Sequence, residues 1–260
     1  VVGLHFFSPA NVMRLLEVVR GAATAKPVVA PAMRLAKRIG KVAVLSGVCD
    51  GFIANRLLAP RGTQAEAMML EGTPIEAIDR VLVDYGFAMG HFQMMDLVGL
   101  DVIGRNATER TVMGDLVAAG RLGQKRGAGY YDYDEKRRPH ASDLTANLIS
   151  EVAAAASVAH SPTVGDEAIL ARLLYPVVNE GARILEEGIA LRASDIDIAA
   201  VLGYNWPVYR GGPLFWADQV GLGKIVADMR QLEALHGETF RPAPLLVRLA
   251  EGGKRFGDRS

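Results

Sequence analysis

The stretch Gly3-Leu4-His5-Phe6-Phe7-Ser8-Pro9-Ala10-Asn11-Val12-Met13-Arg14-Leu15-Leu16-Glu17-Val18-Val19 decides how the chain is interpreted. Two apolar runs, residues 1–7 and 15–19, flank turn-forming residues and indicate two strands joined by a turn. Each run holds one interrupting polar residue, His5 in the first and Glu17 in the second. A polar group in a buried strand needs a partner. If the strands are neighbours, the carboxylate can orient the imidazole and fix its tautomer.

A satisfied core histidine beside an ion-paired glutamate is the competing interpretation of this pair. A third polar residue favours a functional site. Asn55 lies in Gly51-Phe52-Ile53-Ala54-Asn55-Arg56, at the opening of a long helical pattern, where an amide can point into a cleft.

Taken together, these motifs resemble the NAD-dependent L-3-hydroxyacyl-CoA dehydrogenase family of fatty-acid β-oxidation. The matching features are His-Phe-Phe-Ser-Pro, a Glu twelve residues after the His, and Gly-Phe-x-x-Asn-Arg with its Asn fifty residues after the His. The resemblance covers almost the whole chain. It implies oxidation of an L-3-hydroxyacyl-CoA to a 3-ketoacyl-CoA, with His5 as general base, Glu17 as its partner and Asn55 binding substrate.

The resemblance also implies two contacts with the NAD cofactor, from Ser8 and Lys125. Each has a plainer alternative: Ser8 as a turn-stabilising hydroxyl, and Lys125 as an exposed loop lysine. An aromatic, glycine-rich stretch, residues 204–216, matches the second unit of multifunctional members of the family. Trp216 stands where the resemblance leads us to expect Tyr, so no residue of this stretch is assigned to the acyl tunnel. No metal is required, and no His, Cys or carboxylate set has metal-ligand spacing.

Composition excludes several other classes of protein. The 260 residues hold 29 Lys+Arg and 29 Asp+Glu, so no net charge attracts nucleic acid or an anionic membrane. The single cysteine, Cys49, suits a reducing compartment. No apolar run reaches the roughly 18 residues that a membrane span needs. We therefore expect a cytoplasmic protein without a membrane span.

The predicted fold is mainly α, with two tandem helical dehydrogenase C-terminal units following the last strands and helix of a truncated Rossmann-type α/β domain. Residues 1–48 alternate strand and helix signals, and from Gly51 onward the period is helical. One of the predicted helices runs from Met94 to Ala119. The chain contains no Gly-x-Gly-x-x-Gly turn, so the resemblance places this loop upstream of Val1. We expect residues 1–260 alone to be inactive without it.

An internal repeat supports the tandem units. Residues 167–188 align with residues 51–72, and several identities follow at matching positions: Ile53 with Ile169, Arg56 with Arg172, Pro60 with Pro176, Ile78-Asp79 with Ile196-Asp197, and Asp96 with Asp218. Asn55 aligns with Ala171, so the first copy is expected to carry the chemistry. The predicted domains are residues 1–48, the remnant of the NAD-binding domain, and the helical copies 49–140 and 141–260.

Two copies in one chain resemble multifunctional β-oxidation proteins, in which an enoyl-CoA hydratase domain precedes the dehydrogenase. The expected ligand is an acyl-CoA substrate, and a homodimer and a thiolase are candidate partners. Two other interpretations compete: a non-catalytic helical assembly or dimerisation module, and a different two-domain dehydrogenase, such as one acting on sugar acids. The His5, Glu17 and Asn55 set argues against the module, which has no need of polar groups in apolar strands.

Overall fold

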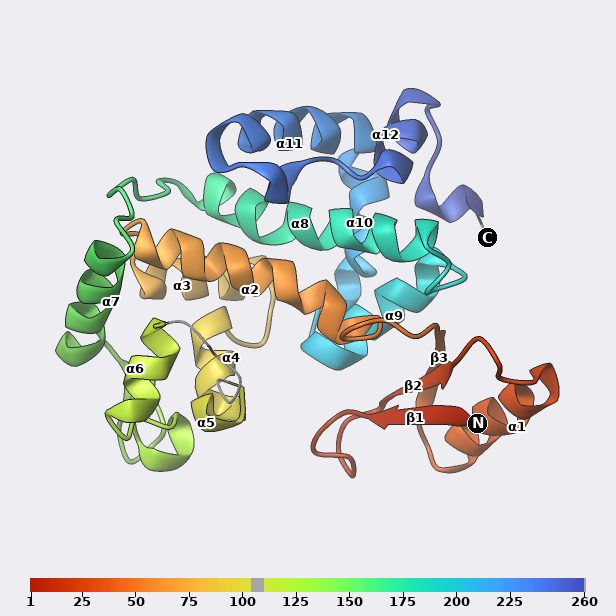
Figure 1. Ribbon diagram of the computed structural model, residues 1–260, viewed down its shortest axis with the longest axis horizontal. Helices are drawn as coiled ribbons and strands as arrows, with labels where there is room; N and C mark the ends of the chain where they lie inside the picture. The colour runs from red at the N-terminus through yellow and green to blue at the C-terminus, as the bar shows by residue number, and fades with distance from the viewer. Residues whose placement is uncertain (104–109, 260) are drawn as a thin grey trace. The chain divides into compact units, whose positions relative to one another are not determined.

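The computed structural model describes residues 1–103 and 110–259 (Figure 1). It is mainly helical with few strands, as the fold-class prediction requires. The chain forms two compact units. The first unit combines Val1–Arg61 with Arg172–Ser260, and the second consists of Gly62–Ala171.

A three-stranded sheet lies at the beginning of the first unit. Strands β1 (Val2–Phe6) and β2 (Leu15–Arg20) are antiparallel, and β3 (Val42–Ser46) runs parallel to β2. Helix α1 (Lys26–Arg38) connects β2 to β3, which gives the strand–helix–strand connection expected of a parallel pair. The two apolar runs of the opening stretch are therefore neighbouring strands, as predicted.

Helices α1 and α9 (Ala193–Tyr204) both pack against β2 and β3, and β2 is buried along nearly its whole length. Gly203 allows the close approach of α9. A Cβ at this position would lie 3.1–3.3 Å from side-chain atoms of Leu15, Phe7 and Ala54. The end of α9 is thus fixed against the strands that carry His5 and Glu17.

The other helices of the first unit include the start of α2 (Ala54–Leu70), most of α8 (Asp166–Glu186), and α10 (Pro213–Val220), α11 (Leu222–His236) and α12 (Pro244–Glu251). Short 3-10 turns lie at Val208–Arg210 (η3), Glu238–Phe240 (η4) and Phe256–Arg259 (η5).

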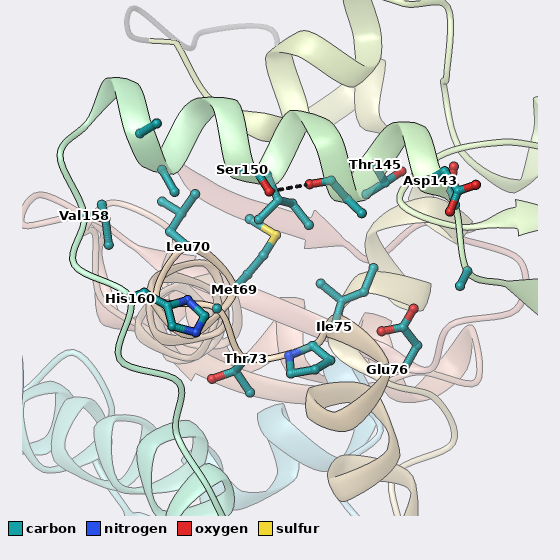
Figure 2. Close-up of a pocket in the computed structure, with 18 residues that line it drawn as sticks. Met69, Leu70, Thr73, Ile75, Glu76, Asp143, Thr145, Ser150, Val158 and His160 are labelled. Carbon is teal, nitrogen blue, oxygen red and sulfur yellow. Dashed lines mark hydrogen bonds between the residues drawn. The ribbon is translucent and has the colours of Figure 1, made fainter.

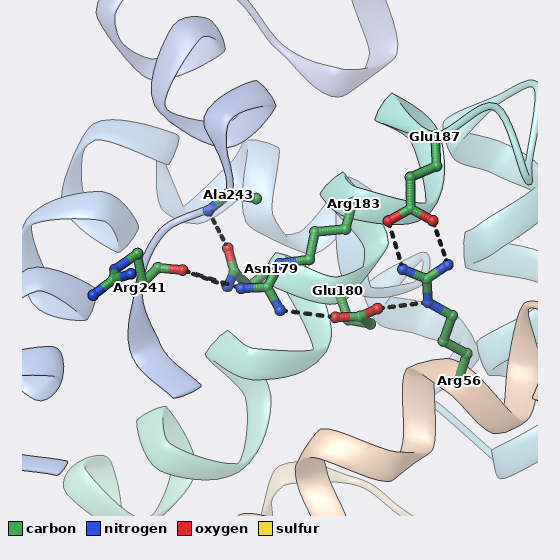
Figure 3. Close-up of polar contacts among 7 residues, drawn as sticks. All are labelled: Arg56, Asn179, Glu180, Arg183, Glu187, Arg241 and Ala243. Carbon is green, nitrogen blue, oxygen red and sulfur yellow. Dashed lines mark hydrogen bonds and ion pairs between the residues drawn. The ribbon is translucent and has the colours of Figure 1, made fainter. Parts of the chain in front are cut away.

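Polar contacts join α2, α8 and the segment before α12 (Figure 3). Arg56 donates from Nε to Glu180 at 2.6 Å and from Nη1 and Nη2 to both oxygens of Glu187 at 2.6 and 2.8 Å. Asn179 accepts from the backbone N–H of Ala243 at 2.6 Å and donates to the carbonyl of Arg241 at 2.9 Å. These contacts satisfy polar groups between helices and fix their register.

The second unit contains the remainder of α2, the start of α8, and a series of shorter elements. These are α3 (Ile75–Tyr85), α4 (His91–Val98), α5 (Leu100–Ile103), α6 (Val112–Ala118), η2 (Gln124–Arg126), β4 (Asp132–Tyr133), β5 (Pro139–His140) and α7 (Asp143–Ala155).

The single helix predicted from Met94 to Ala119 is wrong. Helix α4 ends at Val98 because Gly99 adopts a φ of 102°, a conformation outside the helical region. Helix α6 begins only at Val112, where the side chain of Thr111 accepts the N–H of Gly114 as an N-cap. Residues 104–109, which fall within the predicted helix, lie outside the described residues.

Two buried carboxylates make the same kind of contact at positions that the sequence repeat aligns. Asp79 on α3 accepts the N–H groups of Phe92 and Gln93 at the start of α4, at 2.9 and 3.0 Å. Asp197 on α9 accepts the N–H of Leu214, at the start of α10, at 2.7 Å. Burial raises the pKa of Asp79 to about 6 and that of Asp197 to about 7.

A second pair of aspartates shows the same recurrence. Asp96 on α4 accepts the N–H groups of Tyr130 and Tyr131, and Asp218 on α10 accepts those of Phe256 and Gly257. In each case a carboxylate fixes a later loop onto a short helix. The contacts inside residues 62–171 thus recur inside residues 172–259.

Among residues 1–103 and 110–259, no helix combines the length and the apolar character that crossing a membrane requires.

Candidate functional site

His5 and Glu17 face each other across two paired strands. The β1–β2 register places them directly opposite, so their side chains lie on the same face of the sheet. Nδ1 of His5 lies 2.6 Å from Oε2 of Glu17. Because an ionised carboxylate can only accept, this contact favours the neutral imidazole tautomer with its proton on Nδ1 and its lone pair on Nε2. The structure therefore produces the pairing that the sequence predicted.

The second oxygen of Glu17 is bound to the start of helix α2. Oε1 accepts the backbone N–H groups of Ile53 at 2.9 Å and Ala54 at 3.0 Å. The residues before this helix offer no Ser, Thr, Asp or Asn at the usual capping position, and Glu17 fills that role from β2. Glu17 is fully buried, and three hydrogen bonds compensate the lost hydration of its carboxylate.

Aromatic side chains hold the imidazole of His5 in place. Its ring centroid lies 5.0 Å from that of Phe7 and 5.3 Å from that of Phe52. The side chain of His5 keeps 31% of its surface exposed, and its Nε2 has no partner among the described residues. One ring nitrogen is thus fixed and the other is accessible, which is the arrangement that a general base needs.

Asn55 lies in the first turn of α2, directly after the two N–H groups bound by Glu17. Its Oδ1 accepts a hydrogen bond from the phenol of Tyr204, at the end of α9. The ring of Tyr204 also meets Phe7 edge-on, with centroids 5.9 Å apart. His5, Glu17, Asn55 and Tyr204 therefore form one cluster.

Tyr204 is the residue of this cluster that the sequence did not identify. The aromatic stretch 204–216 was recognised, but nothing in its local pattern selects Tyr204. Burial, followed by the negative charge of Glu17, raises the pKa of Tyr204 to about 12.

The two expected cofactor contacts lie in different units. Ser8 is exposed in the turn that follows β1, and its hydroxyl has no hydrogen-bond partner among the described residues. Lys125 lies in η2 of the second unit, where its ammonium pairs with Asp101 at 2.6 Å. His5, Glu17 and Asn55 are thus brought together in the first unit, with Ser8 close to His5 along the chain.

Family models match most of the chain. The model for the 3-hydroxyacyl-CoA dehydrogenase C-terminal domain matches residues 51–133 and 169–259, and the model for the NAD binding domain of the same enzymes matches residues 1–49. The chain belongs to the 3-hydroxyacyl-CoA dehydrogenase family. The resemblance inferred from the opening stretch is thereby confirmed.

Individual proteins that are similar to this chain agree with this assignment. The peroxisomal bifunctional enzyme of Danio rerio is 39% identical over 97% of this chain and 39% of its own length. The solved dehydrogenase part of multifunctional enzyme 1 from C. elegans is 32% identical, with a TM-score of 0.70 over 95% of this chain and 59% of that chain. The 3-hydroxybutyryl-CoA dehydrogenase of Escherichia coli K12 is 28% identical, with a TM-score of 0.76 over 97% of this chain and 71% of that chain. The present chain spans about two fifths of the length of its curated relatives.

This dehydrogenase-family chain also has a separate cavity in its second unit (Figure 2). The cavity measures about 580 Å³ and lies between the α2–α3 connection and α7. Apolar side chains such as Leu70, Ile75 and Val158 line it, together with His160 and Glu76. None of the predicted site residues lines this cavity, and no pattern in the sequence indicated it.

Proposed function

We propose that this chain carries the general base and a substrate-binding residue of an NAD-dependent L-3-hydroxyacyl-CoA dehydrogenase of fatty-acid β-oxidation. The observation that carries the proposal is the arrangement of one buried carboxylate, Glu17, between the imidazole of His5 and the start of the helix that presents Asn55. His5 also keeps its second ring nitrogen accessible, which a purely structural ion pair would not need.

In the oxidation direction, the 3-hydroxyl group must lose a proton as the hydride leaves C3. His5 accepts that proton at Nε2, because Glu17 holds the other nitrogen as a donor. The resulting imidazolium is stabilised by the carboxylate of Glu17, which lies 2.6 Å from Nδ1. In the reverse direction the same imidazolium returns the proton to the ketone oxygen.

Asn55 supplies the polar contact to the substrate. It is exposed, and no described residue accepts a hydrogen bond from its amide nitrogen. That nitrogen can donate to the thioester carbonyl or to charge that develops on the substrate oxygen.

The residues present fit the reacting end of NAD. The open Nε2 of His5 and the unpartnered hydroxyl of Ser8 lie close together along the chain, and residues 1–49 match the NAD binding domain. When bound, the cofactor supplies the hydride acceptor. Ser8 would contact its nicotinamide end, and Lys125 is the second proposed contact.

We further propose that residues 49–140 and 141–260 are tandem copies of the helical C-terminal unit, after the Rossmann remnant at residues 1–48. The recurring contacts of Asp79 and Asp197, and of Asp96 and Asp218, support this interpretation. A homodimer and a thiolase stay predictions as partners. So does a cytoplasmic location; the relative from Danio rerio is named as peroxisomal.

The test is an assay of the complete polypeptide that contains these residues, with NAD and short L- and D-3-hydroxyacyl-CoA esters. We expect NADH to form with the L ester and not with the D ester. A protein that is folded and binds NAD but turns over neither ester would contradict the proposed function and favour the assembly module. Turnover of a sugar acid in place of the CoA esters would favour the other dehydrogenase class.

A further inference from the structure

The geometry points to Tyr204 as a positioning residue for the proposed dehydrogenase reaction: its phenol holds the amide oxygen of Asn55, so that the amide N–H groups face the acyl-CoA. This inference rests on the proposed function and assigns a task to the later part of the chain. Tyr204 lies 149 residues after Asn55, in the segment that repeats the first helical copy.

The hydrogen bond leaves a defined set of donors on Asn55. A side-chain amide has one acceptor oxygen and two N–H donors, and the phenol O–H of Tyr204 binds the oxygen. No described residue accepts from the nitrogen of Asn55. With its oxygen held by Tyr204, Asn55 presents donors and not an acceptor to a carbonyl oxygen of the substrate.

Tyr204 is itself fixed by one ring contact and by the close packing of its helix against the strands. Its ring meets Phe7 edge-on at 5.9 Å, and the neighbouring Gly203 lets the helix approach the strands closely. Helix α9 ends directly after Tyr204, where Asn205 adopts a left-handed conformation. The position of the phenol is therefore set by the packing of α9 and not by a mobile loop.

The phenol also stays a donor across the neutral pH range. Burial and the nearby carboxylate of Glu17 raise the pKa of Tyr204 to about 12, so the hydroxyl keeps its proton. The same carboxylate binds His5 and the start of α2. Tyr204 thus completes a set of contacts in which the base and the substrate-binding amide are held around the buried carboxylate of Glu17.

The test compares Tyr204→Phe, Asn55→Ala and the double variant in the complete polypeptide, with NADH formation as the readout. We expect Tyr204→Phe to lower kcat by roughly tenfold, the size of one lost hydrogen bond, while KM changes by less than about twofold. In the Asn55→Ala background the same change should have no further effect. Tyr209→Phe is the control, because that phenol lies on an exposed ring outside the cluster.

Each outcome decides the inference. An active wild type with unchanged kcat in Tyr204→Phe would overturn the role of Tyr204 alone. A tenfold loss that persists in the Asn55→Ala background would also overturn it, because the effect would not pass through Asn55. Thermal unfolding of each variant separates this result from loss of the fold. An inactive wild type would overturn the proposed function and, with it, this inference.

Discussion

Glu17 and Ala54 are joined by a hydrogen bond between a strand side chain and a helix backbone: Oε1 of Glu17 accepts the N–H of Ala54 at 3.0 Å. The other oxygen of the same carboxylate holds His5 at 2.6 Å. One buried group therefore sets both the tautomer of the base and the position of the helix that carries Asn55. A substitution at Glu17 that keeps an acceptor for the N–H groups of α2 should therefore affect the chemistry more than the fold.

Glu17→Gln should lower kcat by about a hundredfold or more at neutral pH. The glutamine oxygen can still accept the N–H groups of Ile53 and Ala54, so its amide nitrogen faces His5. Nδ1 of His5 must then accept a hydrogen bond from this amide, so the ring proton moves to Nε2. In this tautomer Nε2 cannot take the proton of the substrate hydroxyl. Steady-state kinetics with a short L-3-hydroxyacyl-CoA measure the effect.

Glu251→Gln is the control for this substitution, because Glu251 is an exposed glutamate at the end of α12. An unchanged kcat in Glu17→Gln, with the fold intact by circular dichroism, would show that Glu17 does not set the tautomer of His5.

Arg56→Lys should lower the free energy of unfolding by about 1–3 kcal/mol. Arg56 is 18% exposed and uses three nitrogens on Glu180 and Glu187, and the hydrogen bond to Glu187 is the largest cause of its raised pKa. Lysine keeps the charge but cannot reproduce the planar fork. Urea unfolding measures the change.

Arg80→Lys is the matched control. Arg80 also binds two carboxylates, those of Asp84 and Asp166, but all three side chains are at least half exposed. We expect little change in the free energy of unfolding for Arg80→Lys, because exposed ion pairs are screened by solvent. Equal effects at Arg56 and Arg80 would mean that the partly buried fork adds nothing to stability.

Gly90→Ala should destabilise the fold by about 1–3 kcal/mol. Gly90 has a φ of −72°, so alanine meets no backbone strain, yet its Cβ would lie 2.1 Å from Cγ of Asp79. The carboxylate would have to leave the N–H groups that it caps. In Gly223→Ala, on α11, the added Cβ meets nothing within 4 Å and should stabilise by up to about 1 kcal/mol. Thermal unfolding that finds the two variants alike would contradict the capping role of Asp79.

The buried carboxyl of Asp197 should make stability depend on pH. Its pKa is about 7 in the folded protein and 3.8 ordinarily, so the folded state binds the proton more tightly. The free energy of unfolding should therefore fall as pH rises from about 4 to about 7, by at most about 4 kcal/mol from this group. Asp197→Asn keeps an acceptor for the N–H of Leu214 and removes the titrating group, so its free energy of unfolding should vary less between pH 4 and 7. Identical curves for both proteins between pH 4 and 7 would contradict this account.

The sequence predicted the His5–Glu17 pair because strand period and turn chemistry are local signals. It could not place Tyr204, whose contact with Asn55 joins residues 149 apart in the chain and depends on how α9 packs. The capping role of Glu17 was missed as well, although a helix start without a capping residue of its own could have indicated a distant partner.

The wrong prediction about the helices has an equally specific cause. Apolar periodicity over residues 94–119 suggested one helix, but Gly99 stops α4 by adopting a positive φ. The repeat held a usable signal here, because Gly221 occupies the aligned position after α10 with a φ of 97°. A glycine that recurs at the same position of both copies was therefore a signal for the end of a helix.

The most direct test of the central claim is the rate of NADH formation by the complete polypeptide with a short L-3-hydroxyacyl-CoA, measured for the wild type and for His5→Gln. Glutamine retains a polar side chain of similar length but cannot accept a proton as imidazole does. Loss of kcat by about 10²- to 10⁴-fold, with NAD binding and thermal stability preserved, is the result expected if His5 is the base. A His5→Gln enzyme that works within a few-fold of the wild type would show that the His5–Glu17 pair is structural and that the base lies elsewhere.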